Sequence, residues 1–535
     1  MKHPQCDDEW CCERCWGLVV DLKDDCSFGE LWGGRLLASP HAPFVVSRGQ
    51  SWSYQEFDQL VAATVERLDS LGVRSGEGLA IQGPNTPERI ALHFAAQLRG
   101  LVTVPLLEGL TPTECARVIA HSGPSWVVTT PGGTALDTGT RVFQDDDNVV
   151  LDRHQRLTDN DIAEMHRIVD RGAGWIIYTS GSSGTPKGVV LPRQSFASCG
   201  VGYSTAFGVE ADDRLLLCFP MGHAIGTHTI PSVALVKGAS IALVERFSVS
   251  NFWRDVSDLK ATTAILFPSQ LTLLSDAAET AAGEAGDSPL RLVITHELHA
   301  AFAKRFPKVE LATVWGMTET GVIGTGERGG QPGRQMNLVG KPMPVEGAEV
   351  SVIDEQGQPQ SPGQPGEIAF RNPVGQMLEY FREPQLTSLT VVDRWVRSGD
   401  LGVLTADGLV FLGRLKNIIK RAGETIIADE IEHLLESHPA VFECSVCAVP
   451  DRTYTEEVGV VVFARPETDV ESLRAWLQSQ LATWKVPRYW LMIDDRLPRL
   501  ENHKLARQAI LAMLTGGESV IDVGDGRSVP TAGSH

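Results

Sequence analysis

The sequence has no long hydrophobic run. None of its stretches approaches the roughly 18–20 consecutive apolar residues that a membrane-spanning helix requires. Residues Met1–Asp25 mix acidic side chains with cysteines, and they lack the basic and then apolar order of a secretory signal peptide. We therefore expect a soluble, cytoplasmic protein without a membrane span.

Positive charge is also in short supply. The chain has 47 Lys and Arg residues against 67 Asp and Glu residues, which gives a formal net charge of −20 at pH 7. An acidic surface repels the phosphates of nucleic acids unless basic residues gather in one patch, and the sequence shows no such gathering. We expect no nucleic-acid partner, and we expect anionic substrates to be met by a few placed lysines and arginines.

Cysteine is too sparse for a disulfide scaffold, with 10 residues in a chain of 535. Half of the cysteines lie near the start of the chain, at Cys6, Cys11, Cys12, Cys15 and Cys26. Cys12 and Cys15 have the spacing of half a zinc site, but no second pair of Cys or His follows at a matching distance. The pattern favours a reduced, partly disordered leader, residues 1–27, over a metal site.

The remaining composition is that of a large globular protein, with 42% apolar, 21% charged and 7% aromatic residues. The length predicts about three to five structural units. Helical patterns, such as the one-sided apolar spacing of Tyr54–Ser70, alternate with short β-branched runs. This alternation predicts α/β layers around buried sheets. The β-branched runs are Ser125–Thr129, Trp175–Thr179, Ile241–Val244, Thr263–Phe267, Leu292–Thr295 and Ala312–Trp315.

The pattern of predicted helices, strands and loops changes in the second half of the chain. Pro359–Gly366 predicts a loop that leads into a small β-rich subdomain, and a compact α+β pattern begins after Arg414. The predicted fold is therefore α/β, with a large N-terminal domain of layered sheets, that β-rich subdomain, and a smaller mobile α+β C-terminal domain. The predicted domain bounds are 28–414 and 415–514, followed by a flexible, polar tail at 515–535.

The strongest local motif is Tyr178-Thr-Ser-Gly-Ser-Ser-Gly-Thr-Pro-Lys-Gly188, which follows a predicted strand. Glycines and hydroxyls on such a loop offer backbone N–H groups and side-chain donors to a polyphosphate, and Lys187 adds a positive charge. A nucleotide-kinase P-loop has four residues between its glycines and Ser or Thr after its lysine, whereas Gly188 follows Lys187 here. The motif indicates a different kind of phosphate loop.

Further motifs follow in order. They are Pro220-Met-Gly-His223, Val314-Trp-Gly-Met-Thr-Glu319, Gly366-Glu367, Ser398-Gly-Asp400, Gly413-Arg-Leu-Lys-Asn-Ile-Ile-Lys-Arg-Ala-Gly423 and Leu497-Pro-Arg-Leu-Glu-Asn-His-Lys504. Together with the phosphate loop they resemble the adenylate-forming superfamily of acyl-CoA synthetases, peptide-synthetase adenylation domains and luciferases. The resemblance runs along most of the chain.

The resemblance implies ATP-dependent activation of a small carboxylic acid to an acyl-adenylate, with release of pyrophosphate. Thioester formation with coenzyme A and release of AMP would follow, so the implied cofactors are ATP, Mg²⁺ and coenzyme A as co-substrate. An ionised acid needs no general base for attack on the α-phosphate of ATP, but it does need charge neutralisation and in-line placement. The small domain is implied to rotate about Lys416 between the two half-reactions.

The resemblance also implies a set of site residues. Glu319 would bind Mg²⁺ as a hard oxygen ligand, Asp400 would accept bonds from the ribose hydroxyls, and Lys504 would draw together the carboxylate and the α-phosphate. The implied catalytic residues are Lys504, Thr318 and Glu319. ATP and AMP are implied to contact Thr179, Ser180, Gly181, Ser182, Ser183, Gly184, Lys187, Trp315, Gly316, Thr318, Asp400, Arg414 and Lys504. The implied acyl-substrate contacts are His223, Ala224, Ile225 and Gly316, and the implied coenzyme A contacts are Lys420, Arg421 and Gly423.

The sequence departs from the superfamily in places. Thr295-His-Glu-Leu298 stands where a Ser-Gly-Gly-Ala stretch is usual, and the loss of both glycines crowds the surface near the purine. His503 replaces a glycine and Ser183 replaces a threonine. The segment Lys420–Glu432 is similar to that of aryl-acid enzymes, but Ala224 follows the pocket histidine where those enzymes have asparagine. The acid is therefore left open among aliphatic, alicyclic, polycyclic and aryl classes.

Alternative functions remain open at this stage. One alternative is an enzyme that loads the acyl group of the adenylate onto the pantetheine of a separate acyl or peptidyl carrier protein. A degenerate, non-catalytic nucleotide-binding protein is suggested by the missing glycines at Thr295–Leu298, although Lys187, Glu319, Asp400 and Lys504 are all present. A luciferase-type oxidation would need a special substrate.

Overall fold

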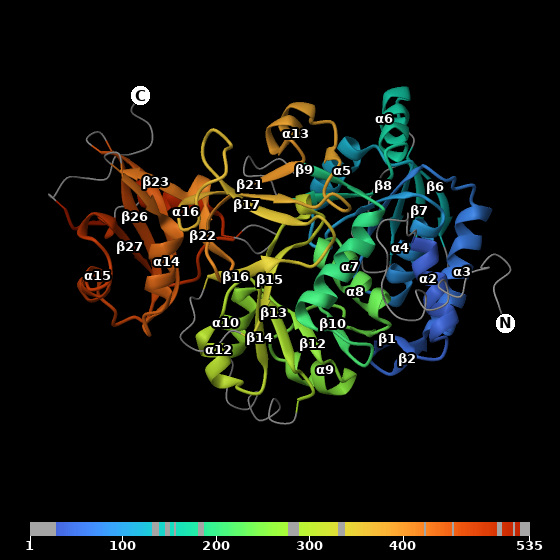
Figure 1. Ribbon diagram of the computed structural model, residues 1–535, viewed down its shortest axis with the longest axis horizontal. Coiled ribbons are helices and arrows are strands. Elements are labelled where there is room, and N and C mark those ends of the chain that lie inside the picture. The colour runs from blue at the N-terminus through green and yellow to red at the C-terminus, as the bar shows by residue number, and fades with distance from the viewer. Residues whose placement is uncertain are drawn as a thin grey trace. The chain divides into compact units, whose positions relative to one another are not determined.

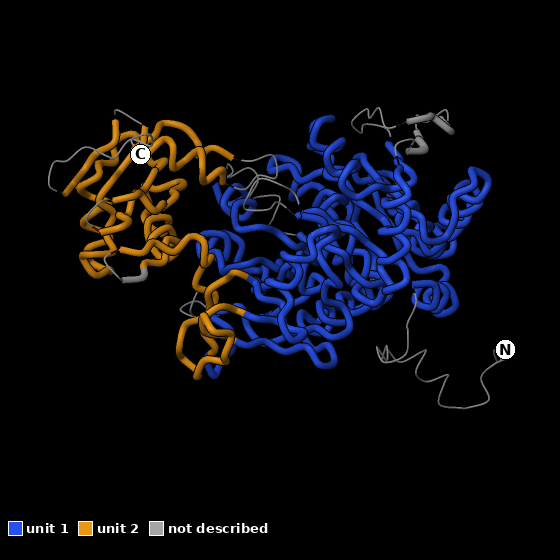
Figure 2. Tube along the Cα trace, turned by 90° about the horizontal axis from the view of Figure 1, so that it is seen from above, with its two compact units in different colours: residues 1–351, 369–398, 405–410 blue, residues 352–368, 399–404, 411–535 orange. Residues whose placement is uncertain are grey.

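The computed structural model describes residues 28–130, 139–144, 150–154, 157–179, 187–276, 288–329, 337–421, 424–451, 454–499, 505–516 and 519–524. The chain divides into two compact units, coloured separately in Figure 2. Unit 1 consists of residues 1–351, 369–398 and 405–410, and unit 2 consists of residues 352–368, 399–404 and 411–535. In the described part of the chain, no helix is both long enough and apolar enough to cross a membrane.

The first sheet of unit 1 has the strand order β19-β9-β8-β4-β3-β5-β7-β6. Its central strands are parallel and fully buried, which is the environment that β-branched residues favour. Its strands are β3 (Gly78–Gln82), β4 (Val102–Pro105), β5 (Trp126–Thr129), β6 (Gly139–Gln144), β7 (Val150–His154), β8 (Ala173–Thr179), β9 (Lys187–Pro192) and β19 (Glu379–Tyr380).

The second sheet of unit 1 includes the order β16-β15-β14-β13-β12-β10-β11-β1-β2. Strands β10 to β14 run parallel to one another, so their carboxyl ends lie along one edge. These strands are β1 (Pro43–Ser47), β2 (Gln50–Ser53), β10 (Arg214–Leu217), β11 (Ser240–Leu243), β12 (Thr263–Ile265), β13 (Leu292–Thr295), β14 (Glu310–Gly316), β15 (Gly324–Arg328) and β16 (Leu338–Pro342). Four strands, β17 (Glu349–Ile353), β18 (Pro365–Arg371), β21 (Trp395–Leu404) and β22 (Leu409–Arg414), divide their residues between the two units, and β20 (Val391–Val392) pairs with β21.

Helices cover the sheets of unit 1 (Figure 1). Helix α2 contacts α3, α4, α7 and α8, and an aromatic cluster that includes Trp32, Phe44 and Phe94 fills the space between them. Ser53 and Glu56 form a capping box at the start of α3, which confirms the helix predicted there. The helices are α2 (Phe28–Ala38), α3 (Tyr54–Ser70), α4 (Pro87–Leu98), α5 (Pro112–Ser122), α6 (Asp159–Val169), α7 (Gln194–Phe207), α8 (Ile230–Lys237), α9 (Phe252–Leu259), α10 (Pro268–Asp276), α12 (Ala300–Arg305) and α13 (Pro384–Thr390).

Unit 2 builds its core on a sheet of order β24-β23-β26-β27-β28, with β25 paired to β26. Its apolar core includes Ile419, Val460 and Trp490, all fully buried. Its elements are β23 (Ile418–Arg421), β24 (Glu424–Ile427), α14 (Ala428–Glu436), β25 (Val441–Asp451), β26 (Thr455–Ala464), α15 (Val470–Gln478), β27 (Tyr489–Ile493), α16 (Arg507–Gly516) and β28 (Ile521–Asp522). The predicted α/β fold class with a smaller α+β unit is confirmed.

One part of the predicted tail belongs to the ordered unit. Composition assigned residues 515–535 to a flexible tail, but α16 continues to Gly516 and β28 pairs with Tyr489 and Trp490. Asp522 accepts a hydrogen bond of 2.9 Å from Nε of Arg488, an interaction between distant residues that local composition does not reveal. The predicted leader, residues 1–27, and residues 525–535 lie outside the described residues.

Candidate active site

The motif that ends in Glu319 follows the carboxyl end of a parallel strand. Its first residues belong to β14, and Thr318–Thr320 then form a short 3₁₀ turn closed by Gly321, whose φ is 78°. A left-handed φ of this kind favours glycine. Ligands of parallel α/β sheets bind beyond the carboxyl ends of the strands, which is where Glu319 lies.

Glu319 is buried and hydrogen-bonded. Its exposed fraction is 7%, and the hydroxyl of Tyr380 donates a hydrogen bond of 2.7 Å to Oε1. Its backbone oxygen accepts a 2.9 Å hydrogen bond from the N–H of Met377. Burial, followed by the adjacent Glu319 carboxylate, raises the pKa of Tyr380, so the phenol stays protonated and acts as the donor.

Lys187 lies over the ring of the same tyrosine. Its Nζ is 5.5 Å from the centroid of the Tyr380 ring, and the ring face attracts a cation at this distance. Lys187 begins β9, and the pairing of Tyr380 with Val189 fixes β19 beside it. A cation and a carboxylate whose motifs are separated by more than a hundred residues therefore share one tyrosine in unit 1.

The predicted phosphate loop connects two paired strands. Thr179 at the end of β8 is directly opposite Lys187 at the start of β9. Next to Thr179, the hydroxyl of Tyr178 is 2.6 Å from Nδ1 of His121 in α5, which ties the strand end to a helix. The loop residues Ser180, Gly181, Ser182, Ser183 and Gly184 lie outside the described residues, so their predicted contacts stay predictions.

The predicted acyl segment is tightly enclosed. The side-chain amide of Asn85 donates 2.8 Å to the backbone oxygen of Phe219, and its oxygen accepts 2.9 Å from the N–H of Met221. A Cβ on Gly222 would lie 2.4 Å from the backbone nitrogen of Leu107, so only glycine fits there. His223 is half-buried, and its Nδ1 accepts 3.2 Å from the N–H of Ile225, which begins a π-helical turn at Ile225–Thr229. Ala224 and Ile225 are buried.

Aromatic rings form a wall beside His223. Phe219, Phe267 and His296 follow the carboxyl ends of β10, β12 and β13, which are adjacent and parallel. The Phe267 ring is 4.8 Å from Phe219 and 5.9 Å from His223, and it stacks on His296 at 5.4 Å with an interplanar angle of 21°. His296 thus fills with an imidazole the position where the superfamily has glycine, while Thr295 is fully buried.

The remaining members of the motif Val314–Glu319 differ in exposure. The Trp315 side chain is buried, with 5% exposure, and its ring is 6.1 Å from that of Phe370. Gly316 ends β14, where an added Cβ would lie 3.1 Å from the backbone oxygen of Ile323, and Thr318 is half-buried. The indole packs into the core, and the predicted contact of Trp315 with the nucleotide stays a prediction.

In unit 2, Asp400 and Arg414 form an ion pair. Nη1 of Arg414 is 2.8 Å from Oδ1 of Asp400, and the Asp400 side chain is 3% exposed against 46% for Arg414. The backbone N–H of Arg414 donates 2.9 Å to Asp429, and the N–H of Gly399 donates 2.9 Å to Glu367. Asp400 and Arg414, which come from two different motifs, are therefore in contact within unit 2, and their predicted roles at the nucleotide stay predictions.

The predicted coenzyme A and hinge residues lie at the start of unit 2. Lys420 is exposed, whereas Nε of Arg421 donates 2.5 Å to the buried Glu457, and its guanidinium lies 4.4 Å from the Tyr454 ring centroid. Lys416 is exposed on a 3₁₀ turn, Leu415–Asn417. Gly423 and the predicted catalytic Lys504 lie outside the described residues.

Sequence reasoning missed three residues of the site: Tyr380, Phe267 and His296. A signal for Phe267 and His296 was available, because Phe267 ends one predicted strand and His296 directly follows another, at the edge where ligands bind. No local signal marked Tyr380, whose contact with Glu319 joins residues 61 positions apart.

The sequence is similar to known proteins over most of its length. Residues 35–381 match the model of the family described as AMP-binding enzyme, and residues 430–504 match that of the AMP-binding enzyme C-terminal domain. The chain is 30% identical over 456 residues to a sulfoacetate–CoA ligase of Cupriavidus necator, covering 82% of this chain and 88% of that protein. It is 30% identical to a feruloyl-CoA synthase of Amycolatopsis sp, with coverages of 88% and 96%. It is 27% identical to a fatty acid–[acyl-carrier-protein] ligase, ScoC, of Streptomyces coeruleorubidus, with coverages of 88% and 93%.

The fold is also similar to that of solved structures. The crystal structure of ATP-bound MatB from Rhodopseudomonas palustris superposes with a TM-score of 0.74 and 23% sequence identity. The match covers 90% of this chain and 97% of that one, so the similarity extends over both units.

Proposed function

Because the chain belongs to the AMP-binding enzyme family, we propose that it activates a carboxylic acid with ATP and transfers the acyl group to coenzyme A. In the first step a carboxylate oxygen of the acid attacks the α-phosphorus, the bond to the β-phosphate oxygen breaks, and pyrophosphate leaves. In the second step the sulfur of coenzyme A bonds to the acyl carbon, AMP leaves with the electron pair of the broken C–O bond, and the thiol proton is released. The relatives named for CoA ligation of sulfoacetate and ferulate support this reaction class.

The observation that carries the proposal is the grouping of Lys187 and Glu319 around Tyr380. Two motifs expected to meet the phosphates of one nucleotide supply a cation and a carboxylate to the same place in unit 1. Lys187 is assigned to the phosphates of ATP, where its positive charge offsets the repulsion between the anionic acid and the nucleotide. Thr179 and Thr318, both half-buried hydroxyls, are assigned to phosphate oxygens.

Glu319 fits a magnesium ion that is shared with substrate. Mg²⁺ is usually held by one or two carboxylates together with phosphate oxygens rather than by a cage of protein ligands. Within the described residues no group of three or more His, Cys, Asp and Glu side chains is arranged to hold a metal, and Glu319 is a single buried carboxylate. When bound, the ion would neutralise phosphate charge; Glu319 would hold it, and Tyr380 keeps that carboxylate in place.

The roles of unit 2 are proposed from its motifs, and for Asp400 and Arg414 also from the contact between them. Asp400 is assigned to the ribose hydroxyls and Arg414 to the ribose or a phosphate, because the two are paired at 2.8 Å. Lys504 is assigned to the acid and the α-phosphate, and Lys420, Arg421 and Gly423 to the thiol half-reaction. Residues 415–514 act as a small domain that rotates about Lys416 between the half-reactions, so a Lys416→Pro variant is expected to make the adenylate but not the thioester.

The acyl acceptor has a second candidate. The relative named as a ligase for acyl-carrier protein supports loading of a separate carrier pantetheine. Coenzyme A is preferred because the other named relatives use it. Saturation by holo-carrier protein at micromolar concentration, with poor use of coenzyme A, would reverse this preference. The acid remains open, and the cytoplasmic location remains a prediction.

The test is pyrophosphate release by purified protein with MgATP and a panel of aliphatic, aryl, polycyclic and sulfonated acids, with and without coenzyme A. We expect acid-dependent release that turns over repeatedly only when coenzyme A is present. A Lys504→Ala variant should lose pyrophosphate release but keep thioester formation from a presynthesised acyl-adenylate. Absence of release across the panel, with ATP binding retained, would favour the non-catalytic alternative.

A further inference from the structure

Tyr380 occupies a two-residue strand that is fixed on both sides. Hydrogen bonds run from the N–H of Leu378 to Val190 at 2.8 Å and from the N–H of Phe381 to Gly188 at 2.7 Å. The acceptor of the second hydrogen bond is the backbone oxygen of Gly188, the residue directly after Lys187. The backbone of β19 therefore sets the position of the Tyr380 ring relative to the start of β9.

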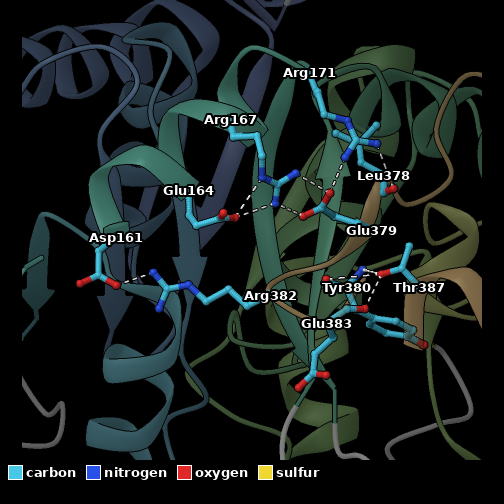
Figure 3. Close-up of polar contacts among 10 residues, drawn as sticks. All are labelled: Asp161, Glu164, Arg167, Arg171, Leu378, Glu379, Tyr380, Arg382, Glu383 and Thr387. Carbon is cyan, nitrogen blue, oxygen red and sulfur yellow. Dashed lines mark hydrogen bonds and ion pairs between the residues drawn. The ribbon is translucent and has the colours of Figure 1, made fainter. Parts of the chain in front are cut away.

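The residue before Tyr380 is clamped by two arginines of a distant segment. Nη1 of Arg167, on α6, donates 2.8 Å to Oε2 of Glu379, and Arg171 forms a second ion pair with the same carboxylate (Figure 3). Arg171 also donates 3.2 Å to the backbone oxygen of Leu378. The Glu379 side chain is only 12% exposed. Neighbouring side chains of a strand point to opposite faces, so α6 holds Glu379 on one face while Tyr380 reaches Glu319 on the other.

A third ion pair fixes the exit of the strand. Arg382 has a φ of 61°, a conformation that a non-glycine residue adopts only under constraint, and its guanidinium pairs with Asp161 of α6 (Figure 3). The backbone N–H of Tyr380 donates 2.9 Å to the hydroxyl of Thr387 in α13. Helix α6 thus braces the segment around Tyr380 both before and after the tyrosine.

We propose that Tyr380 is a positioning residue for the divalent cation: its hydroxyl orients the Glu319 carboxylate, its ring attracts the Lys187 ammonium, and Arg167 of α6 and Arg171, just after that helix, hold it in place through Glu379. This inference rests on the proposed function, since it takes Glu319 as the metal ligand. If the Glu319 carboxylate rotated about its Cγ–Cδ bond, it would present a different oxygen to the metal. The 2.7 Å bond to Oε1 removes that freedom and leaves the orientation of Oε2 defined.

The direct test is a Tyr380→Phe variant, which keeps the ring beside Lys187 and deletes only the hydroxyl. Binding of Mn²⁺, measured by electron paramagnetic resonance in the presence of α,β-methylene-ATP, reports the metal site without turnover. We expect the apparent dissociation constant of Mn²⁺ to rise about tenfold, the size of effect that follows from losing a hydrogen bond to a charged group. In steady state, the Mg²⁺ concentration for half-maximal activity should rise by a similar factor, while the rate at saturating Mg²⁺ should fall much less.

Two reference variants make the result specific. Glu319→Gln removes the proposed metal ligand and should weaken Mn²⁺ at least as much as Tyr380→Phe. Tyr54→Phe deletes another buried phenol hydrogen bond, 2.9 Å to the backbone oxygen of Ala239, far from the site, and should leave Mn²⁺ binding unchanged. A difference between the two tyrosine variants therefore cannot come from loss of stability alone.

The contribution of the ion pairs that Arg167 and Arg171 form with Glu379 is tested by a double-mutant cycle. Glu379→Gln should weaken Mn²⁺ binding by a smaller factor than Tyr380→Phe, and adding it to Tyr380→Phe should have almost no further effect, because both act through one hydroxyl. Glu310→Gln breaks a comparable surface ion pair, with Arg328 at 2.9 Å, and is the matched control.

The outcomes distinguish the positioning role of Tyr380 from the role of Glu319 as a metal ligand. Weakened Mn²⁺ binding in Tyr380→Phe, with Tyr54→Phe unchanged, supports the positioning role. Normal binding in Tyr380→Phe together with weakened binding in Glu319→Gln overturns the positioning role and leaves the proposed function standing. Normal binding in Glu319→Gln overturns the metal assignment itself, and the inference falls with it.

Discussion

Because His228 is buried, we expect the free energy of unfolding to depend on pH, and the size of this effect can be calculated from the pKa of His228. His228 lies in the π-helical turn Ile225–Thr229, directly after the acyl segment, and has no exposed surface. Its Nε2 is 2.9 Å from the hydroxyl of Ser195, and its ring meets Trp175 edge-on at 4.6 Å. Burial lowers the pKa of His228 from 6.5 to about 3.

The sign follows from proton linkage. In the unfolded chain His228 binds a proton as the pH falls below about 6.5, whereas in the folded chain it stays neutral down to about pH 3. Stability is therefore fully present above pH 6.5, is lost as the pH falls, and stops falling below the folded pKa. Each unit of pH within this window costs about 1.4 kcal/mol, so the loss attributable to His228 is about 2 kcal/mol at pH 5 relative to neutral pH.

The assay is urea unfolding at pH 7.5 and pH 5, followed by circular dichroism, for the wild type and a His228→Gln variant. Glutamine keeps a partner for Ser195 and cannot titrate, so its loss of stability between the two pH values should be about 2 kcal/mol smaller than that of the wild type. His166→Gln, at an exposed position on α6, should behave as the wild type does. Equal losses in the wild type and His228→Gln would refute the burial argument.

Other predictions address the site. Lys187→Ala should raise the KM for MgATP about tenfold or more, because it removes the cation beside the Tyr380 ring, while Lys187→Arg should recover part of the affinity; equal KM values for Lys187→Ala and wild type would reject the assignment. Asp400→Asn should weaken ATP binding in calorimetry by roughly tenfold and leave 2′,3′-dideoxy-ATP binding almost unchanged, whereas equal weakening of both nucleotides would show that the ribose hydroxyls are not its partners. His296→Ala removes a ring stacked on Phe267 and should shift the preferred acid toward a larger one by about tenfold in kcat/KM; an unchanged ranking of acids would mean that the aromatic wall does not contact the substrate.

The fold was largely predictable because its signals are local. The strand predicted at Leu292–Thr295 is β13, with the same bounds. Buried parallel strands consist of short runs rich in β-branched residues, which can be recognised in the sequence. Helix α3 begins at a capping box that four consecutive residues specify. Where the prediction failed, at β28, the pairing depends on Arg488 and on a strand end more than thirty residues away.

The site was predictable only as far as its motifs extend. Lys187 and Glu319 were found because each belongs to a recognisable segment, and Asp400 with Arg414 for the same reason. Tyr380 was not found, because its role depends on the pairing of β19 with β9 and on Arg167 and Arg171, which no local pattern encodes. The crowding at Thr295–Leu298 was noted in the sequence, but its consequence needed the register that places His296 beside Phe267.

The burial of the site's carboxylates bears on the non-catalytic alternative. Removing a carboxylate from water costs several kcal/mol unless partners replace its hydration, and apolar residues of similar size often give a more stable core. Glu319 and Asp400 are nevertheless 7% and 2% exposed, and each is held by a partner at 2.7–2.8 Å. A protein selected only for its fold would gain by replacing such groups, whereas one that binds a nucleotide and its metal needs them. His296, by contrast, adds an imidazole to an aromatic wall beside His223. We propose that this departure affects which acid fits and not the phosphate chemistry, so it does not argue for the non-catalytic alternative.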